Sequence, residues 1–211
     1  MDSADVMAPK FIYFDLGKVL VDFDVERMYR QVGEVAGIGP ARVREVLLDE
    51  GLQVDYELGR ISGEEFHATF CERTGTRPDY HALERAASDI FELNVGILPV
   101  VAHLAEAGYR LGLLSNTCRS HWEHCRRRFC ILAECFAVCA LSYEVRAAKP
   151  SAAIFRAAAE LAGAPPEEIF FTDDTAGHVA GARAVGFDAV QYTSPRQLAA
   201  GLRSRGLRFN Y

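Results

Sequence analysis

Five short apolar runs recur along this chain and constrain its fold more than any other feature. They cover residues 11–15, 109–114, 135–142, 169–172 and 187–192. Their apolar residues follow one another without a polar residue at every second position, which is the pattern of strands buried on both faces. Between the runs, segments such as 97–108, 151–163 and 176–186 carry apolar residues at helical spacing. This alternation predicts an α/β fold with a parallel sheet that helices cover on both faces.

Residues 22–95 interrupt the alternation of strands and helices. They contain four stretches with the apolar periodicity of amphipathic helices and no predicted strand, namely 25–37, 41–52, 62–75 and 80–93. Four helices inserted directly after the first strand are expected to form a separate helical cap domain over the crevice at the strand ends. We therefore predict an α/β core from residues 1–21 and 96–211, and a helical cap from residues 22–95.

Composition and charge restrict the class of protein. The 211 residues are 50% hydrophobic, which suffices for a full core and an insertion. The net charge of −6 and the lack of a long basic block argue against nucleic-acid binding, and we expect the basic stretch 119–128 to be a solvated helix face. No apolar run approaches the roughly 20 residues of a membrane span, and residues 1–10 lack a signal-peptide pattern. A soluble cytoplasmic protein without a membrane partner is expected.

Five of the six cysteines lie between residues 118 and 139. Because the chain shows no secretory signal, reduced thiols are expected. His121, His124, Cys125 and Cys130 are residues of the types that bind zinc, but no CxxC pair with a matching second pair is present. Buried cysteines that act as small apolar side chains are the favoured interpretation.

Polar residues gather at the carboxyl ends of the predicted strands, where parallel sheets bind ligands. In chain order they are Asp15, the stretch 115–117 (SNT), Lys149 and the pair Asp173–Asp174. A carboxylate can attack a phosphoryl group as a nucleophile, hydroxyl and amide groups can hold the transferred oxygens, and a lysine can neutralise their charge. Two adjacent carboxylates can hold Mg²⁺, which prefers carboxylate and water ligands. Together these residues favour metal-assisted phosphoryl transfer.

The same stretches resemble the haloacid dehalogenase (HAD) superfamily. The closest likeness is to the subgroup that reads FDLGNV…VD, LSNT, KP and FFDD and includes α-D-glucose-1-phosphate phosphatase. Here those stretches read FDLGKVLVDFD, LSNT, KP and FTDD, and YELGRIS at 56–62 resembles the E-x-G-x-I element of that subgroup. The resemblance implies a Rossmann-like core, and the place of the cap fits the all-helical (C1-type) insertion.

The resemblance also implies a Mg²⁺ site. Asp15 and the backbone carbonyl of Gly17 would bind the metal. Asp174 would be a direct ligand, and Asp173 would be a second ligand or would hold a metal-bound water. His178 stands four residues after Asp174, where the family usually carries Asp or Asn, and we expect it to support the metal-binding carboxylates rather than to bind the metal.

The resemblance assigns the remaining residues to phosphate. Asp15 would be the nucleophile that becomes an aspartyl phosphate, and Lys149 would bridge this residue and the phosphate. Ser115 and Asn116 would bind the phosphoryl oxygens. The substrate would be a small phosphorylated metabolite.

Three positions near these motifs depart from the family pattern. Gly17 stands where most phosphatases of the superfamily have a second aspartate, which protonates the leaving group and later activates water. Lys18 replaces an asparagine, and its charge could either crowd the site or serve it. Arg146 replaces a glycine that is common before the Lys-Pro pair. Asp22 and Asp24 could relay protons in place of residue 17, although turn and cap roles are favoured for both.

The loss of the acid at position 17 favours substrates whose leaving group needs little protonation. General acid–base help is worth roughly 10²–10⁴-fold. Phosphoryl transfer passes through a loose transition state with much charge on the departing oxygen. Anomeric, aryl or acyl phosphates carry that charge better than a primary alkoxide does. Together with the subgroup likeness, this favours a sugar 1-phosphate or a similar compound.

The sequence therefore favours a Mg²⁺-dependent phosphatase and leaves two alternatives open. One is a metal-independent 2-haloacid dehalogenase, a branch that also lacks the second aspartate. The other is a catalytically weak binding or regulatory protein on an enzyme scaffold. Substrate choice is expected to lie in the cap, where four residues are candidates to face the crevice: Tyr56, Glu57, Arg60 and Phe66.

Overall fold

The computed structural model describes residues 8–211. Residues 1–7, which form most of the stretch in which we found no signal-peptide pattern, lie outside the described residues. The core is a five-stranded sheet in the order β5-β4-β1-β6-β7, and every neighbouring pair is parallel. Its strands are β1 (Phe11–Phe14), β4 (Leu111–Ser115), β5 (Val138–Leu141), β6 (Ile169–Asp173) and β7 (Asp188–Gln191). The predicted α/β fold with a parallel sheet is confirmed.

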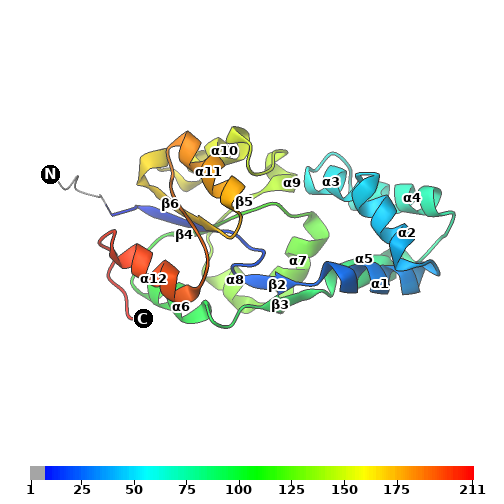
Figure 1. The fold of residues 1–211 in the computed structure, drawn as a ribbon, viewed down its shortest axis with the longest axis horizontal. Helices are drawn as coiled ribbons and strands as arrows, with labels where there is room; N and C mark the ends of the chain where they lie inside the picture. Colours follow the sequence, from blue (N-terminus) through cyan, green and yellow to red (C-terminus); the bar gives the residue numbers. More distant parts are fainter. Residues whose placement is uncertain (1–7) are drawn as a thin grey trace.

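Helices cover both faces of the sheet (Figure 1). On one face lie α10 (Ala152–Ala162) and α11 (Ala176–Val185), and on the other lie α6 (Leu98–Glu106) and α12 (Pro195–Arg203). Strand β1 feeds both layers, because successive side chains of a strand point to opposite faces. Phe11 and Tyr13 pack with α10 and α11, whereas Ile12 and Phe14 pack in the cluster that includes α6 and α12. This double burial explains why the strands read as continuous apolar runs.

Short helices complete the core. They are α7 (Arg119–Arg128), α8 (Cys130–Glu134), α9 (Ser142–Val145) and the 3₁₀ turn η2 (Pro166–Glu168). The basic stretch 119–128 is thus helical, as expected. The six cysteines all lie within the described residues and are free thiols. Among the helices of residues 8–211, none combines the length and the apolar composition that a bilayer span requires.

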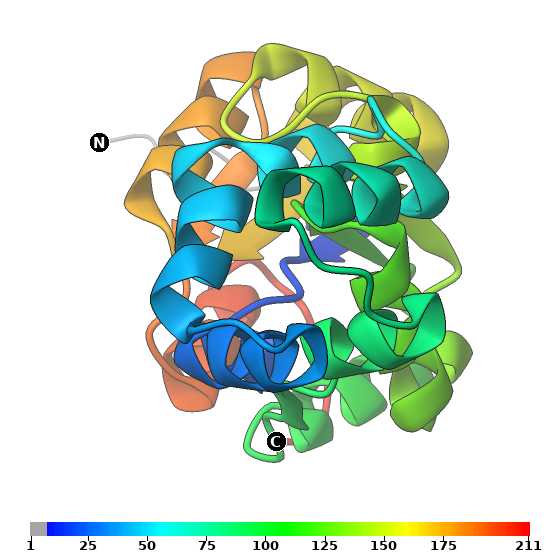
Figure 2. The same ribbon diagram turned by 90° about the vertical axis from the view of Figure 1, so that its right-hand side faces the viewer.

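The helical cap lies at one end of the molecule, beyond the carboxyl ends of the strands (Figures 1 and 2). Its elements are α1 (Val25–Ala36), α2 (Pro40–Arg44), the π-helical segment η1 (Glu45–Asp49), α3 (Leu52–Glu57), α4 (Gly63–Thr74) and α5 (Tyr80–Ser88). Side-chain caps start three of them: Asp24 for α1, Ser62 for α4 and Asp79 for α5. Helix is found in all four predicted stretches. The second stretch is divided, because α2 passes into the π-helical segment and α3 begins only at Leu52.

A two-stranded antiparallel sheet connects the cap to the core, and the sequence did not predict it. Strand β2 (Val21–Phe23) pairs with β3 (Phe91–Leu93). The predicted helix over 80–93 is therefore wrong after Ser88, where α5 ends. The rings of Phe23 and Phe91 lie 6.0 Å apart across this pair, so the contact between the two aromatics favours the ladder over another helical turn. The predicted cap boundaries at residues 22 and 95 fall within β2 and just after β3.

Candidate active site

At the carboxyl end of the sheet, a ligand-binding crevice is expected between β1 and β6. The sheet strands that follow β1 in the sequence, β4 and β5, lie on one side of it, whereas β6 and β7 lie on the other side. The direction in which strands are added to the sheet therefore reverses between β1 and β6. The register pairs Phe14 with Thr172, which places the residues that follow each of them side by side. Asp15 follows Phe14, and its N–H donates to the Thr172 carbonyl at 2.9 Å. Asp173 is the last residue of β6. Pairing of the strands thus brings two carboxylates together.

Lys149 joins these two carboxylates. Its side chain is only 1% exposed, and Nζ lies 2.8 Å from Oδ1 of Asp15 and 2.6 Å from Oδ2 of Asp173. Nζ also donates to the carbonyl oxygen of Leu114 at 2.9 Å. A lysine ammonium has three N–H donors, and here each has an acceptor. The buried positive charge is therefore fully paired, and it neutralises one of the two negative charges beside it.

Asn116 holds Lys149 in place through the backbone. Its Oδ1 accepts from the Lys149 N–H at 2.8 Å, and its Nδ2 donates to the Lys149 carbonyl at 3.0 Å. Since the side-chain amide is engaged in this way, the predicted contact of Asn116 with phosphate is left to its backbone N–H. The neighbouring Ser115 ends β4, and its buried hydroxyl lies 3.4 Å from the Asn116 carbonyl oxygen. The loop after β4 is thus tied to the loop that carries Lys149.

The two carboxylates differ in their electrostatic environment. Burial raises the pKa of Asp15 to about 6, although Lys149 opposes this shift. Burial would also raise the pKa of Asp173, but the hydrogen bond from His178 and the charge of Lys149 outweigh it and lower the pKa to about 2. Asp173 is therefore firmly ionised, and Asp15 is ionised at neutral pH.

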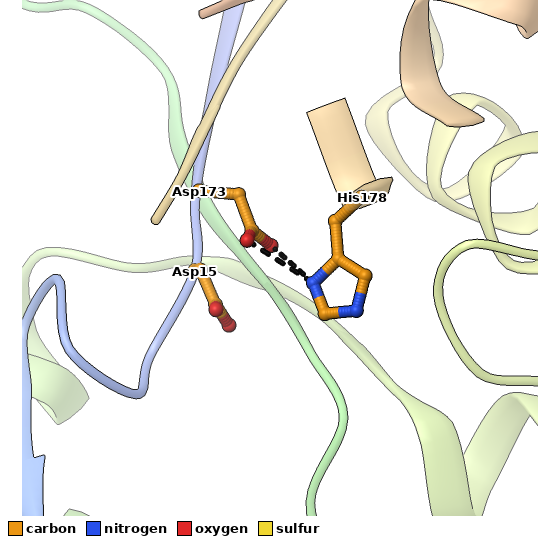
Figure 3. A group of neighbouring side chains, drawn as sticks. All are labelled: Asp15, Asp173 and His178. Atoms are coloured by element: carbon orange, nitrogen blue, oxygen red, sulfur yellow. Dashed lines mark hydrogen bonds and ion pairs between the residues drawn. The ribbon is translucent and has the colours of Figure 1, made fainter. Parts of the chain in front are cut away.

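Asp15, Asp173 and His178 form a group whose potential ligand atoms all lie within 4.8 Å of one another (Figure 3). The Nδ1 atom of His178 is 3.1 Å from both oxygens of Asp173, which requires the hydrogen on Nδ1. Two carboxylates in one crevice fit a hard cation such as Mg²⁺. Gly17, whose carbonyl is the third expected ligand, lies on the loop that follows Asp15. With Nδ1 turned to Asp173, His178 contacts a carboxylate of the group.

Asp174, which the sequence favours as a direct metal ligand, does not belong to this group. Its Oδ1 lies 3.5 Å from the Thr175 hydroxyl, and its carbonyl accepts from the Gln191 side chain at 2.8 Å. The structure therefore brings together Asp15, Lys149 and Asp173 and leaves Asp174 beside them.

A phenyl ring occupies the space next to Gly17. A Cβ atom added at Gly17 would lie 2.9 Å from Cε1 of Phe23, closer than carbon atoms normally approach. The nearby aspartates are engaged elsewhere. Asp24 caps α1 by accepting from the Arg27 N–H at 2.9 Å, and the exposed Asp22 lies 3.6 Å from the Lys18 ammonium. The place of the missing aspartate is thus filled by an apolar ring.

The two other departures from the family pattern lie at left-handed backbone positions. Lys18 has φ of 59° and Arg146 has φ of 57°. Asparagine and glycine adopt this conformation more readily than lysine and arginine do, which explains why the family carries them there. The ammonium of Lys18 lies 3.1 Å from the carbonyl oxygen of Phe23 and 4.7 Å from the centre of its ring. Lys18 therefore directs its charge to strand β2.

A cavity of about 210 Å³ lies between the core and the cap, next to the loop that follows β4. The core contributes Leu16, Gly17, Ser115, Asn116, Thr117 and His121, and β2, β3 and the cap contribute Phe23, Val25, Met28, Tyr29, Leu47, Leu48, Gln53, Glu57, Ile90 and Phe91. Of the four cap residues named from the sequence, Glu57 lines this cavity. Tyr56 and Phe66 stack at 5.1 Å and line a smaller neighbouring cavity, and the exposed Arg60 pairs with Asp55.

The apolar wall of this cavity was not predicted from the sequence. Val25, Met28 and Tyr29 follow one another at i, i+3 and i+4 and share one face of α1. That spacing is visible in the sequence, but it predicts a cap helix without showing what the helix faces. The sequence gives no comparable signal for the residues of η1 that line the cavity, because the change from α- to π-helix does not follow a simple periodicity of apolar residues.

Comparison with known proteins identifies the family. A model of the haloacid dehalogenase-like hydrolases matches residues 9–186. The chain belongs to this family. A HAD-like family hydrolase from Porphyromonas gingivalis has a similar structure, with 27% identity, a TM-score of 0.81, and coverage of 95% of this chain and 100% of that one.

A second similar structure contains ligands. It is a HAD family enzyme from Bacteroides thetaiotaomicron in complex with magnesium and inorganic phosphate, with 27% identity and a TM-score of 0.78. The match covers 88% of this chain and 95% of that one. A HAD phosphatase from Thermococcus onnurineus shares the fold at 21% identity and a TM-score of 0.66, with coverage of 92% of this chain and 97% of that one.

Proposed function

We propose that this HAD-like hydrolase is a Mg²⁺-dependent phosphatase that acts on a small phosphorylated metabolite. The observation that carries the proposal is the joining of Asp15 and Asp173 by Lys149 at the crevice between β1 and β6. The complex of the Bacteroides enzyme with magnesium and inorganic phosphate supports both the metal and the phosphoryl group.

In this proposal Asp15 is the nucleophile. One of its carboxylate oxygens forms a bond to phosphorus while the bond from phosphorus to the leaving oxygen breaks, which gives an aspartyl phosphate and the leaving group as its oxyanion, which then takes a proton from solvent water. Water then attacks the phosphorus and releases inorganic phosphate and the Asp15 carboxylate. Lys149 holds Asp15 in place and neutralises charge on the transferred oxygens.

Asp15, Asp173 and the carbonyl of Gly17 would hold Mg²⁺, with His178 and Lys149 fixing the carboxylate of Asp173. When bound, Mg²⁺ neutralises charge on the phosphoryl group and helps to orient it. Ser115 and the backbone of Asn116 would bind the phosphoryl oxygens. Asp174 would be a further carboxylate beside this group.

The leaving group should need little protonation, because the chain has no carboxylic acid at Gly17. Sugar 1-phosphates, aryl phosphates and acyl phosphates meet this requirement better than esters of primary alcohols. The sequence favours a sugar 1-phosphate within this class.

The first test is release of phosphate from p-nitrophenyl phosphate with Mg²⁺ and with a chelator. We expect turnover that depends on Mg²⁺ and falls to the background rate in Asp15→Asn. Asp79→Asn is the matched control, because Asp79 caps α5 far from the crevice and asparagine can keep that cap. This control should retain activity.

Other outcomes would point to the alternatives. Release of halide from a 2-haloacid in the presence of chelator would favour the metal-independent dehalogenase. Stabilisation by Mg²⁺ and phosphate without any turnover would favour a binding protein on this scaffold.

A further inference from the structure

The cavity beside the loop that follows β4 could hold the part of the substrate that leaves. It shares Gly17, Ser115 and Asn116 with the site proposed above for Mg²⁺ and phosphate. A group attached to a phosphoryl group at that site would therefore extend into the cavity toward the cap. The choice of leaving group by this cavity rests on the proposed phosphatase function.

The walls of the cavity are mainly apolar. Met28 and Leu47 are buried cap residues that face it, and Phe23 and Phe91 approach it from the two-stranded sheet. Its volume of about 210 Å³ is large enough for an aromatic ring, since an apolar cavity of about 150 Å³ binds benzene. Size and lining thus fit a ring better than a short polar chain.

Two of the polar side chains that line the cavity already have partners. The side chain of Gln53 donates to Glu57 at 2.9 Å, and the amide of Asn116 is bound to the backbone of Lys149. A sugar would bring several hydroxyls out of water, and hydroxyls without new partners oppose binding.

The charges of the cavity exclude a second anionic group. Among the described residues that line it, there is no lysine or arginine. Glu57 is a carboxylate, and burial lowers the pKa of His121, which keeps this ring neutral near pH 7. A carboxylate or second phosphate on the leaving group would therefore meet no positive partner there.

The absence of an acid at Gly17 places a second requirement on the leaving group, and this requirement does not depend on the residues that line the cavity. The leaving oxygen must carry its own negative charge, and Phe23 fills the place from which an acid would act. An apolar aliphatic alcohol would fit the apolar walls but would carry the negative charge poorly as it leaves. A phenol fits the walls and also carries this charge.

We propose that the substrate is an aryl phosphate, a monoester of an uncharged, phenol-like alcohol whose ring lies in the cavity between α1, η1 and the two-stranded sheet. This proposal narrows the class of leaving groups and weighs against the sugar 1-phosphate favoured by the sequence.

Four phosphate monoesters test separately the need for an apolar ring and the need for a leaving group that departs without protonation. Phenyl and benzyl phosphate both carry an apolar ring, but only phenol leaves easily. Glucose 1-phosphate and glucose 6-phosphate are both hydrophilic, and only the first leaves from an anomeric carbon. With Mg²⁺, we expect kcat/KM for phenyl phosphate to exceed that for glucose 1-phosphate by about 10- to 100-fold, as burial of one ring predicts. It should exceed that for benzyl phosphate by about 100-fold or more.

The outcomes distinguish this proposal from the proposed function. Activity that depends on Mg²⁺ and Asp15 but is equal or higher with glucose 1-phosphate would overturn the aryl phosphate and leave the phosphatase intact. Equal rates with phenyl and benzyl phosphate would overturn the leaving-group requirement. No release from any of the four esters would overturn the phosphatase itself.

A matched pair of variants tests whether the ring lies in this cavity. Leu48 is 50% exposed and lines the cavity, whereas Val54 is 46% exposed and does not. Because both side chains are half exposed, asparagine at either position should leave the fold intact. We expect Leu48→Asn to raise KM for phenyl phosphate about threefold, with the ratio of phenyl phosphate to glucose 1-phosphate activity falling equally. Val54→Asn should change neither. Identical behaviour of the two variants would overturn the placement of the ring.

Discussion

Gly17 and Phe23 depend on each other through packing. The Phe23 ring lies where a side chain at position 17 would begin, and the Lys18 ammonium stands over the same ring, 4.7 Å from its centre. A single substitution of Gly17 by aspartate therefore meets an aromatic ring that is itself held by a cation–π contact. The lack of the second aspartate is thus a property of several residues that pack together.

Gly17→Asp and Phe23→Ala should accordingly couple. We expect Gly17→Asp alone to lower the free energy of unfolding by about 1–3 kcal/mol through overpacking. In the Phe23→Ala background the same change should cost at least about 1 kcal/mol less, and hydrolysis of benzyl phosphate should rise because an acid is now available. Urea unfolding of the two single variants, the double variant and the parent protein measures this coupling. Strictly additive changes in the free energy of unfolding would show that the Phe23 ring moves aside without destabilising the protein.

Residue identity alone predicted part of the site. Asp15 and Asp173 could be placed at the crevice because each stands at a strand end of a parallel sheet, and Lys149 because it matches the Lys-Pro motif of the family. The binding of the Asn116 amide to the Lys149 backbone could not be predicted, because two loops far apart in the sequence create it. Nor could the left-handed conformation at Arg146, since no glycine or asparagine marks that position.

At the scale of the element, the stretch 57–61 (ELGRI) docks the cap on the core. The carbonyl oxygen of Glu57 lies 2.6 Å from the Ser142 hydroxyl, at the start of α9. Gly59 has φ of 61°, and a Cβ atom there would collide with the carbonyl oxygen of Tyr143. Ile61 packs at the edge of the hydrophobic core. The glycine of this motif is therefore needed for its backbone conformation and for the close approach to α9.

Gly59→Ala should destabilise the protein more than the same change at Gly75. Gly75 has φ of 71° but nothing within 4 Å of its hypothetical Cβ, so Gly75→Ala reports the left-handed penalty alone. That penalty is about 1–2 kcal/mol. We expect Gly59→Ala to cost at least about 1 kcal/mol more in the free energy of unfolding and to raise KM, because α3 must move away from α9. Urea unfolding and phosphatase kinetics of both variants check this, and equal losses of stability would contradict the docking role.

The elements themselves were predicted to different degrees. All five strands of the parallel sheet were found because each is a short stretch rich in apolar residues between helical segments. Strands β2 and β3 have three residues each, too few for any alternation to appear. Ile90 and Phe91 also continue the apolar spacing of α5, so only pairing with β2 decides that they leave the helix.

In the whole molecule, residues of both the core and the cap line the proposed substrate cavity. His121 lies where the two domains meet. This residue of α7 is 9% exposed, and its ring meets Phe91 of β3 edge-on at a distance of 5.2 Å. Glu57 and the backbone of Ala87 favour the charged imidazole, but burial outweighs them and lowers the pKa below the ordinary 6.5. The folded protein therefore holds His121 neutral at a pH where the unfolded chain binds a proton.

This difference predicts a loss of stability in acid. Above pH 6.5 both states leave His121 neutral, so its titration contributes nothing. Below about pH 6.5 the unfolded state takes up a proton that the folded state resists, so the free energy of unfolding falls as pH decreases, by at most about 1.4 kcal/mol per pH unit. The loss should level off below the folded-state pKa. His121→Gln should remove this component, while the exposed His81→Gln serves as the control.

Urea unfolding between about pH 5 and 8 measures the effect as the difference between the parent protein and each variant. The difference is needed because Asp15 acts in the opposite direction: its raised pKa of about 6 lets the folded state bind a proton more tightly than the unfolded state does. We expect the parent protein to lose more stability than His121→Gln below pH 6.5 and to follow His81→Gln throughout. Parallel curves for parent and His121→Gln would mean that the junction of cap and core accommodates the imidazolium without cost.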